Sequence, residues 1–274
     1  MSDTTVPTTT ADAPSSVDDS RAVGYEMDGL VAHLVMQHRP HNFLGVALME
    51  GLVDGVAWAR EKGARAVVVR STLRHFCAGA DVTLFSSAQH GAAPNGDLTE
   101  VLRVFDDLPI PILASVHGVC VGGGFELALA CDLIIAAESS KIGSVEATIG
   151  LNPLMGAMQR VAQRAGAARA KEMALLARRY DARTLERWNV INRVVPDDQL
   201  SDATNVLAQE LAHGPTVAHA SSKRIISVAV NQGVRAADEA MHDLQKDVWA
   251  SNDLKEGLTS LLAHGPGAAR FEGK

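Results

Sequence analysis

The sequence predicts an α/β fold in which buried strands alternate with helices. Continuous apolar runs without polar alternation are typical of strands buried on both faces. Four such runs occupy residues 30–36, 66–69, 112–116 and 133–136. Residues 46–59 instead place apolar side chains at helical spacing and lead to Lys62 and Gly63, a cation and a glycine that favour a helix end. This alternation indicates crossover units that join parallel strands.

After Pro153 the sequence pattern predicts mainly helices. Helical spacing is found at residues 167–177, 184–188, 199–213, 217–231 and 234–262. A short strand is expected at 190–196. We place a boundary near Asp197, between a core of residues 21–196 and a helical region of residues 197–274. Because the helical region is small and apolar on one face, we expect it to pack on the core or on another subunit.

Two polar stretches fall outside this pattern. Residues 1–20 contain mainly Thr, Ser, Asp, Ala and Pro, so ordering them would cost entropy without burying apolar surface. We predict a disordered arm there, and its first 19 residues lack the basic and apolar regions of a secretory signal. Residues 86–97 (SSAQHGAAPNGD) are interpreted as either a mobile lid or an exposed insertion.

Composition excludes several classes of function. Lys and Arg number 25 against 32 Asp and Glu, which gives a formal net charge of −7, so we expect no nucleic-acid partner. Every apolar run is too short to span a membrane, and we expect no membrane partner. The three cysteines show no CxxC spacing, which favours a reducing compartment and predicts a cytoplasmic protein.

A glycine-rich turn is the most informative feature. Residues 122–124 are three glycines between a β-rich run and a helix-favouring segment that carries Glu126. Bare backbone N–H groups at such a turn can form an anion or oxyanion site. For an isolated triplet, a flexible linker or a tight strand-to-helix turn is the more common explanation. Apolar neighbours predict a buried Glu126 with a raised pKa; the alternative is a glutamate that the helix dipole favours in the first turn.

Two further segments complete a candidate site. Glu146 follows a short apolar strand, and together with Glu126 it would suit a reaction that removes one proton and delivers another. The alternative is a solvated glutamate at a strand end. Residues 76–81 (FCAGAD) place small residues after another strand and could present a second N–H opposite the glycine turn. Alone, this motif would be a tight turn with an aspartate cap.

Other reactive residue types carry no recognisable motif. The ten histidines form no HExxH sequence and no cluster with cysteine, so we predict no metal site. We interpret His117, close to the glycine turn, as packed or hydrogen-bonded. Cys77 has no histidine partner that the sequence identifies.

Taken together, these motifs resemble the enoyl-CoA hydratase/isomerase family, also called crotonases. The similarity lies in FCAGAD (76–81), GVCVGGGFELALACD (118–132), KIGSVEATIGLNP (141–153) and QRVAQRAGAARAKEM (159–173), which occur in the order of the family. The resemblance implies a crotonase-like superhelix of ββα units with a helical C-terminal region. It also implies homotrimers, which often pair into homohexamers, and makes residues 197–274 the oligomerisation region.

The resemblance also implies a chemistry. The thioester carbonyl of an acyl-CoA would accept hydrogen bonds from the N–H groups of Ala80 and Gly123, Glu126 would activate water, and Glu146 would protonate the α-carbon. Further substrate contacts would come from Ala78, Asp81, Val82, Gly122 and Leu154. The expected activity is that of a lyase that hydrates a trans-2-enoyl-CoA, with coenzyme A as part of the substrate and no separate cofactor.

Some positions depart from the family pattern. Leu154 replaces the first glycine of the usual P-G-A-G-G and alters the surroundings of the water site. Basic residues near the C-terminus are lost, and Arg74 or Lys223 are the candidates to hold the CoA nucleotide instead. Asn189 replaces a glycine after a helix, a conservative change for a left-handed C-cap. The alternatives are therefore an isomerase or other crotonase-type acyl-CoA enzyme, or a non-catalytic acyl-CoA-binding homologue.

Overall fold

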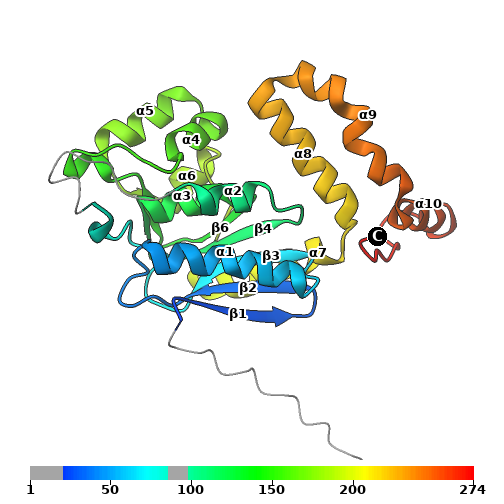
Figure 1. Cartoon of the computed structure of the whole chain (residues 1–274), viewed down its shortest axis with the longest axis horizontal. Coiled ribbons are helices and arrows are strands. Elements are labelled where there is room, and N and C mark those ends of the chain that lie inside the picture. The colour runs from blue at the N-terminus through cyan, green and yellow to red at the C-terminus, as the bar shows by residue number, and fades with distance from the viewer. Residues whose placement is uncertain (1–20, 86–97) are drawn as a thin grey trace, which may run out of the picture.

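The fold is built on a six-stranded sheet (Figure 1). The computed structural model describes residues 21–85 and 98–274, so the predicted arm 1–20 and the predicted lid or insertion 86–97 lie outside the described residues. The strands in spatial order are β1 Val23–Asp28, β2 Val31–Met36, β3 Ala66–Ser71, β4 Ile112–Val116, β6 Leu133–Ala137 and β9 Arg193–Val195. Only β1 and β2 pair antiparallel in this sheet, and the other pairs are parallel. All four predicted apolar runs are strands of this sheet.

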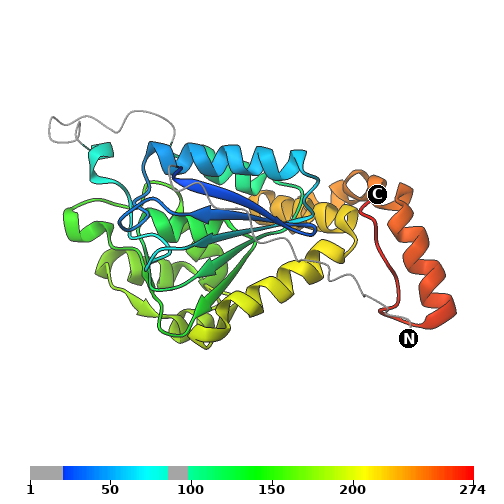
Figure 2. The same cartoon turned by 90° about the horizontal axis from the view of Figure 1, so that it is seen from below.

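Both faces of the sheet are buried, as the apolar runs predict. Val67 and Val69 of β3 share one core with α1 Val46–Glu61, whereas Val68 shares a second core with α7 Leu200–His213. In Figure 2 α1, in blue, and α7, in yellow, lie on opposite faces of the sheet. Because α7 covers the sheet, part of the region after Asp197 packs on the core.

A second, smaller sheet carries the functional segments. It consists of β5 Val119–Val121, β7 Lys141–Gly143 and β8 Tyr180–Asp181, and a bridge between Cys77 and Cys120 attaches the chain that follows β3. The chain thus passes from the large sheet to the small sheet and returns through a helix. The helix after β5 is α3 Gly123–Ala130, all of whose residues are buried. This repeated ββα path confirms the crotonase-like superhelix that the family resemblance implies.

The remaining helices of the core are short. They are α2 Glu100–Asp106, α4 Ala157–Ala165, α5 Ala167–Leu176 and α6 Ala182–Arg187, with 3₁₀ turns η2 Glu146–Ile149 and η3 Asp197–Gln199. Helix α6 begins before the predicted residue 184, because the carboxylate of Asp181 accepts a 2.8 Å hydrogen bond from the Thr184 N–H and caps it.

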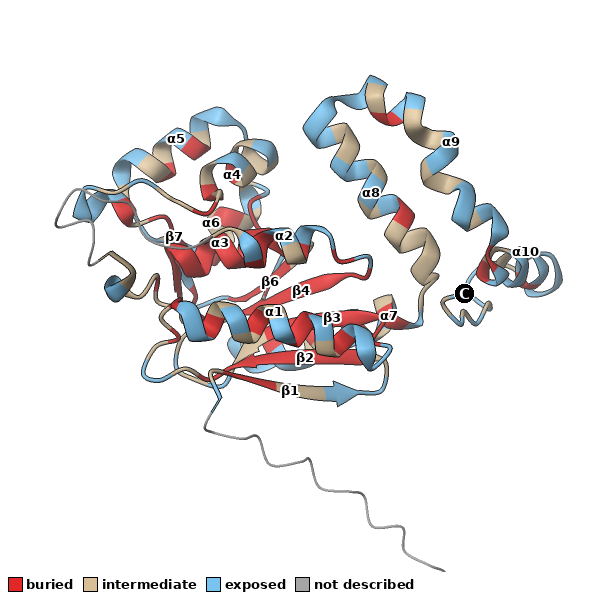
Figure 3. Cartoon of the chain, in the orientation of Figure 1, coloured by how far each residue is buried: buried red, intermediate tan, exposed pale blue. Residues whose placement is uncertain are grey.

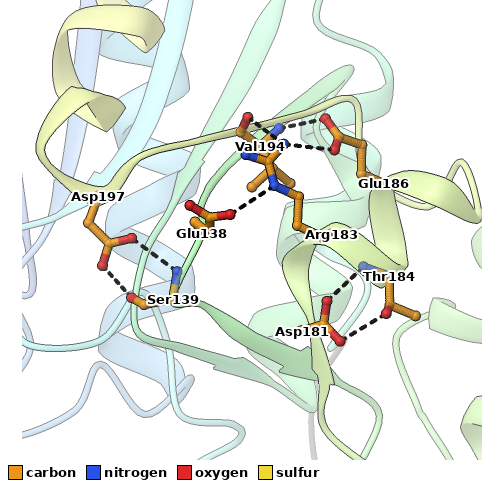
Figure 4. A network of polar contacts seen from close by, with 8 residues as sticks. All are labelled: Glu138, Ser139, Asp181, Arg183, Thr184, Glu186, Val194 and Asp197. Carbon is orange, nitrogen blue, oxygen red and sulfur yellow. Dashed lines mark hydrogen bonds and ion pairs between the residues drawn. The ribbon is translucent and has the colours of Figure 1, made fainter.

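A polar network fixes the start of the C-terminal region (Figure 4). Arg183 pairs with Glu138 at 3.1 Å, and Glu186 accepts a 2.9 Å hydrogen bond from the Val194 N–H. Asp197 accepts a 3.0 Å hydrogen bond from the backbone N–H of Ser139 and also pairs with its hydroxyl. The residue at the predicted boundary is therefore tied to the core, and the division of the chain there stays a prediction.

The C-terminal helices differ from expectation in one respect. Residues 234–262 were expected to form one helix, but they form α9 Val234–Ala250 and most of α10 Asn252–His264, after α8 Thr216–Gln232. That prediction is wrong because Ser251 is extended and its hydroxyl caps α10 by accepting from the Leu254 N–H at 3.1 Å. The carbonyl of Lys274 also accepts from the first N–H groups of α10.

Helices α8 and α9 pack along each other at one end of the sheet, away from α4 and α5 (Figure 1). Most residues of α8, α9 and α10 are exposed or intermediate (Figure 3). Several of their large apolar side chains face solvent in the single chain: Ile226, Val230, Val234, Trp249, Leu258 and Leu262. None of the helices within the described residues combines the length and the hydropathy needed to cross a bilayer.

Candidate active site

A cavity of about 150 Å³, open to solvent, lies where the glycine turn, the FCAGAD segment and η2 meet. Its walls are mostly apolar side chains. They come from Leu44, Met49, Val82, Leu84, Phe85, Leu98, Val145, Ile149, Leu151, Leu154 and Met155. The described residues add three polar side chains to this lining, those of Glu126, Glu146 and Thr148. The two predicted carboxyl groups therefore meet in one apolar cavity.

Glu126 lies in the first turn of α3 and is only 3% exposed. Its Oε1 accepts hydrogen bonds from the backbone N–H groups of Met155 at 2.7 Å and Ala157 at 3.2 Å. Burial raises the pKa of Glu126 to about 7, although these two hydrogen bonds favour the ionised form and oppose the rise. The carboxyl can thus give or take a proton near neutral pH, as the apolar sequence context predicts.

Glu146 is the first residue of η2, and Ser144 and Val145 separate it from the end of β7. Its Oε2 accepts a 2.5 Å hydrogen bond from the hydroxyl of Ser144. Its Oε1 is buried and has no hydrogen-bond partner among the described residues. This oxygen lies beside the glycine turn, 3.6 Å from where a Cβ on Gly122 would be. Glu146 is 9% exposed, which contradicts the alternative of a solvated glutamate at a strand end.

Two backbone N–H groups lie close together at the cavity wall. Leu44 donates to the Gly79 carbonyl at 2.8 Å and accepts from the Asp81 N–H at 3.0 Å, which leaves the N–H of Ala80 on the opposite side of the strand. Gly123 is the first residue of α3, where an N–H has no partner within the helix. A Cβ on Gly123 would lie 3.6 Å from the Ala80 nitrogen. Paired N–H groups of this kind can stabilise negative charge on a carbonyl oxygen.

Glycine is required twice in this turn. Gly122 has a φ of +55°, in the region that L side chains rarely adopt. A Cβ on Gly124 would lie 2.6 Å from both the Cβ and the carbonyl oxygen of Cys77. The absence of side chains thus lets α3 begin directly against the FCAGAD segment, and this contact holds the two N–H groups together.

The structure places the remaining predicted contact residues unequally. Ala78, Val82, Gly122 and Leu154 all line the cavity. Asp81 is absent from the lining, and its carboxylate instead accepts hydrogen bonds from the N–H and hydroxyl of Thr83 at 2.9 and 2.8 Å. These bonds lower the pKa of Asp81 and fit the alternative of an aspartate cap. A substrate contact by its side chain stays a prediction.

The candidate cations for the nucleotide lie outside this lining. The ammonium of Lys223 pairs with Asp132 at 2.6 Å and donates to the Ile110 carbonyl at 3.0 Å, so it is committed to the core. Arg74 is exposed in the loop that leads to FCAGAD. Neither side chain borders the described cavity.

The other reactive side chains that the sequence analysis considered are engaged in packing or hydrogen bonds. His117 Nε2 pairs with the Leu73 carbonyl at 2.7 Å, which confirms its interpretation as hydrogen-bonded. Cys77 is fully buried, and burial raises the pKa of its thiol to about 12, so it is no nucleophile at neutral pH. Within residues 21–85 and 98–274 no three His, Cys, Asp or Glu side chains group as metal ligands.

Sequence reasoning missed two sets of contacts. The first is the hydroxyl of Ser144, two residues before Glu146. The second is the pair of N–H groups after Leu154 that hold Glu126. The short spacing between Ser144 and Glu146 is a local signal that could have identified the first; the second joins segments 29 and 31 residues apart and has no local signal.

Comparison with known proteins shows which sequences and folds this chain is similar to. The profile of the family described as enoyl-CoA hydratase/isomerase matches residues 26–268. A probable enoyl-CoA hydratase of Rhodobacter capsulatus is 31% identical over 253 residues, covering 89% of this chain and 96% of the relative. The mitochondrial methylglutaconyl-CoA hydratase of Rattus norvegicus is 30% identical over 261 residues, covering 91% and 81%. The crystal structure of enoyl-CoA hydratase from Bacillus anthracis superposes with a TM-score of 0.84 at 26% identity, covering 93% of this chain and 100% of that one.

Proposed function

Because this chain belongs to the enoyl-CoA hydratase/isomerase family, we propose that it hydrates a trans-2-enoyl-CoA thioester. The observation that carries the proposal is the pair of buried carboxyl groups, Glu126 and Glu146, on one apolar cavity beside the N–H groups of Ala80 and Gly123. Hydration needs a base that removes a proton from water and an acid that donates a proton to the α-carbon. Two carboxyl groups on one cavity can fill these two roles.

The proposed reaction assigns one role to each group. The thioester oxygen accepts hydrogen bonds from the Ala80 and Gly123 N–H groups. Glu126 removes a proton from water, whose oxygen bonds to the β-carbon while the double-bond electrons shift to the thioester oxygen as an enolate. The enolate then collapses, and the α-carbon takes a proton from Glu146. The β-carbon has then gained the hydroxyl group and the α-carbon the proton. Proton exchange with solvent returns Glu126 and Glu146 to their starting protonation states.

The pKa of about 7 supports the role of Glu126 as the base. Close to half of the carboxyl is then ionised at neutral pH, and a base of this pKa has a larger driving force for proton removal than an ordinary glutamate. The two N–H groups that hold Oε1 leave Oε2 for the water. Coenzyme A enters as part of the substrate, and the proposed reaction needs no further cofactor.

The lining of the cavity supports an apolar acyl group. Besides the two carboxyl groups, the described lining offers only the hydroxyl of Thr148 as a polar side chain. An acyl group with its own carboxylate, as in methylglutaconyl-CoA, would place that charge against apolar walls and beside Glu126 and Glu146. The described lining residues include no cation to pair with it. We therefore propose alkyl enoyl groups as the substrate class.

The exposed apolar side chains of α8 to α10 support assembly into a homotrimer or homohexamer, because such surface is usually covered in a protein's working state. Helix α9 alone exposes Trp249 at 69% and Val234 at 70%. Light scattering of the purified chain gives the number of copies directly.

Leu154 favours a second candidate, a double-bond isomerase. Its side chain lines the cavity immediately before the N–H groups that hold Glu126. An apolar side chain there reduces the space for water beside Glu126, and isomerisation moves a proton between two carbons without water.

The test follows loss of the conjugated thioester absorbance of crotonyl-CoA and of trans-2-octenoyl-CoA. Glu126→Gln and Glu146→Gln are compared with Glu61→Gln, a control at the exposed end of α1. Hydration by the parent and the control, with losses of at least about 100-fold in both site variants, would support the proposal. Conversion of trans-3-enoyl-CoA without hydration would identify an isomerase, and acyl-CoA binding without either reaction would identify a non-catalytic binder.

A further inference from the structure

Ser144 is a buried serine that the proposed reaction does not yet use. It is 1% exposed and lies between β7 and η2, two residues before Glu146. Its hydroxyl donates to Glu146 Oε2 at 2.5 Å. A hydroxyl that donates to an ionised carboxylate makes a charge-assisted hydrogen bond, which is stronger than one between neutral groups.

The backbone fixes Ser144 on both sides. The end of β7 pairs with β5 through Val121 and Gly143, and the Gly122 N–H donates to the Gly143 carbonyl at 3.1 Å. After Glu146, its own carbonyl accepts from the Leu151 N–H at 3.1 Å and closes the turn. The hydroxyl of Ser144 is therefore held by the same strand end that positions the glycine turn.

The two oxygens of Glu146 have different environments. Oε2 accepts from Ser144, whereas Oε1 is buried beside Gly122 without a partner among the described residues. A buried carboxyl oxygen without a hydrogen-bond partner is unusual in proteins, and it is consistent with an oxygen that bonds to a ligand when one is present. While Oε2 accepts the serine hydrogen, a proton on the neutral carboxyl is carried by Oε1, the oxygen next to the cavity.

We propose that Ser144 is a positioning residue that holds Glu146 so that Oε1 exchanges protons with the α-carbon of the bound acyl group. The inference rests on the proposed function in one respect, the assignment of Glu146 to the α-carbon. Without the serine hydrogen bond, the carboxyl can rotate and can place its proton on Oε2.

The test isolates proton exchange at the α-carbon from the addition of water. Butyryl-CoA, which has no double bond, is incubated with the protein in D₂O, and loss of its α-proton signal is followed by NMR. Glu146 takes an α-proton, the C–H electrons move to the thioester oxygen as an enolate, and a solvent-exchanged deuteron returns from Glu146 to the same carbon. Hydration of crotonyl-CoA is measured in parallel.

We expect Ser144→Ala to lower the exchange rate at saturating butyryl-CoA, and kcat for hydration, by about 10- to 100-fold with KM within about twofold of the parent. Ser144→Cys keeps the volume with a much weaker donor and should show the same loss, whereas Ser144→Thr keeps the hydroxyl and should restore most of the rate. Ser140→Ala is the matched control, because Ser140 is fully buried before β7 and bonds to the Val116 carbonyl at 3.2 Å.

The outcomes separate the two proposals. Exchange without hydration in the parent protein refutes the hydratase proposal and still tests Ser144 through its variants. Full exchange in Ser144→Ala or Ser144→Cys overturns the positioning role, as does an equal loss in Ser140→Ala. Neither reaction in the parent protein, despite binding of butyryl-CoA, overturns both proposals, because Glu146 then moves no proton at the α-carbon.

Discussion

Replacing Glu126 with Gln should stabilise the protein in alkaline solution. The side chain is 3% exposed, and burial raises its pKa from the ordinary 4.5 to about 7. At 1.36 kcal/mol per pKa unit, the buried ionised carboxyl lowers the free energy of unfolding by about 3 kcal/mol. Glutamine keeps an oxygen that can accept from the Met155 and Ala157 N–H groups and removes the charge.

The pH dependence has a definite sign. Between pH 4.5 and about 7 the folded protein holds this proton more tightly than the unfolded chain, so wild-type stability falls as the pH rises through that window. The variant has no such group. Its advantage in free energy of unfolding should therefore grow from less than about 1 kcal/mol at pH 5 to about 3 kcal/mol at pH 8.

Urea unfolding at pH 5, 6, 7 and 8, at one protein concentration, measures this difference. Glu61→Gln, an exposed position at the end of α1, provides the baseline for the same change of residue type. A difference that does not change with pH, or that shrinks toward pH 8, would show that burial does not destabilise the Glu126 carboxylate, and the argument for a tuned base would be lost.

Three further predictions concern the pH dependence of hydration and two positions in the fold. If Glu126 is the base, kcat/KM for hydration should rise about tenfold from pH 6 to pH 8 around its pKa of about 7, and a flat pH profile would contradict that role. Gly124→Ala should lower stability by at least about 1–3 kcal/mol in thermal unfolding, because the added Cβ meets Cys77 atoms at 2.6 Å; an unchanged melting temperature would disprove this close contact. Asn189→Ala should cost about 1 kcal/mol and Asn189→Gly should cost less, since φ is +61° there; equal losses in both variants would count against a left-handed cap.

The sequence could predict those features that depend on neighbouring residues. Strands β2, β3, β4 and β6 were expected because a run buried on both faces must be continuously apolar, and both cores of the sheet show why. The left-handed residues Gly63 and Asn189 follow helices at the predicted positions. The raised pKa of Glu126 follows from its apolar neighbours in α3.

Features that depend on residues far apart in the sequence were harder to predict from the sequence. The break between α9 and α10 is stabilised by Ser251, whose capping role is local, but also by Lys274, whose carbonyl meets the first N–H groups of α10. The apolar spacing of residues 234–262 continues across this break, so periodicity alone predicts one long helix. A capping serine followed by Asn252 and Asp253 is the signal that competes with that periodicity.

The two carboxyl groups show why a site is harder to predict than its residues. Glu126 and Glu146 each stand in an apolar local context, yet their chemical difference arises from their partners. Two backbone N–H groups from residues 155 and 157 hold Glu126, whereas a serine side chain holds Glu146. A backbone donor leaves no trace in residue identity, because any residue but proline supplies it. A side-chain donor does leave a trace, and therefore Ser144, unlike the donors to Glu126, can be tested by changing a single side chain.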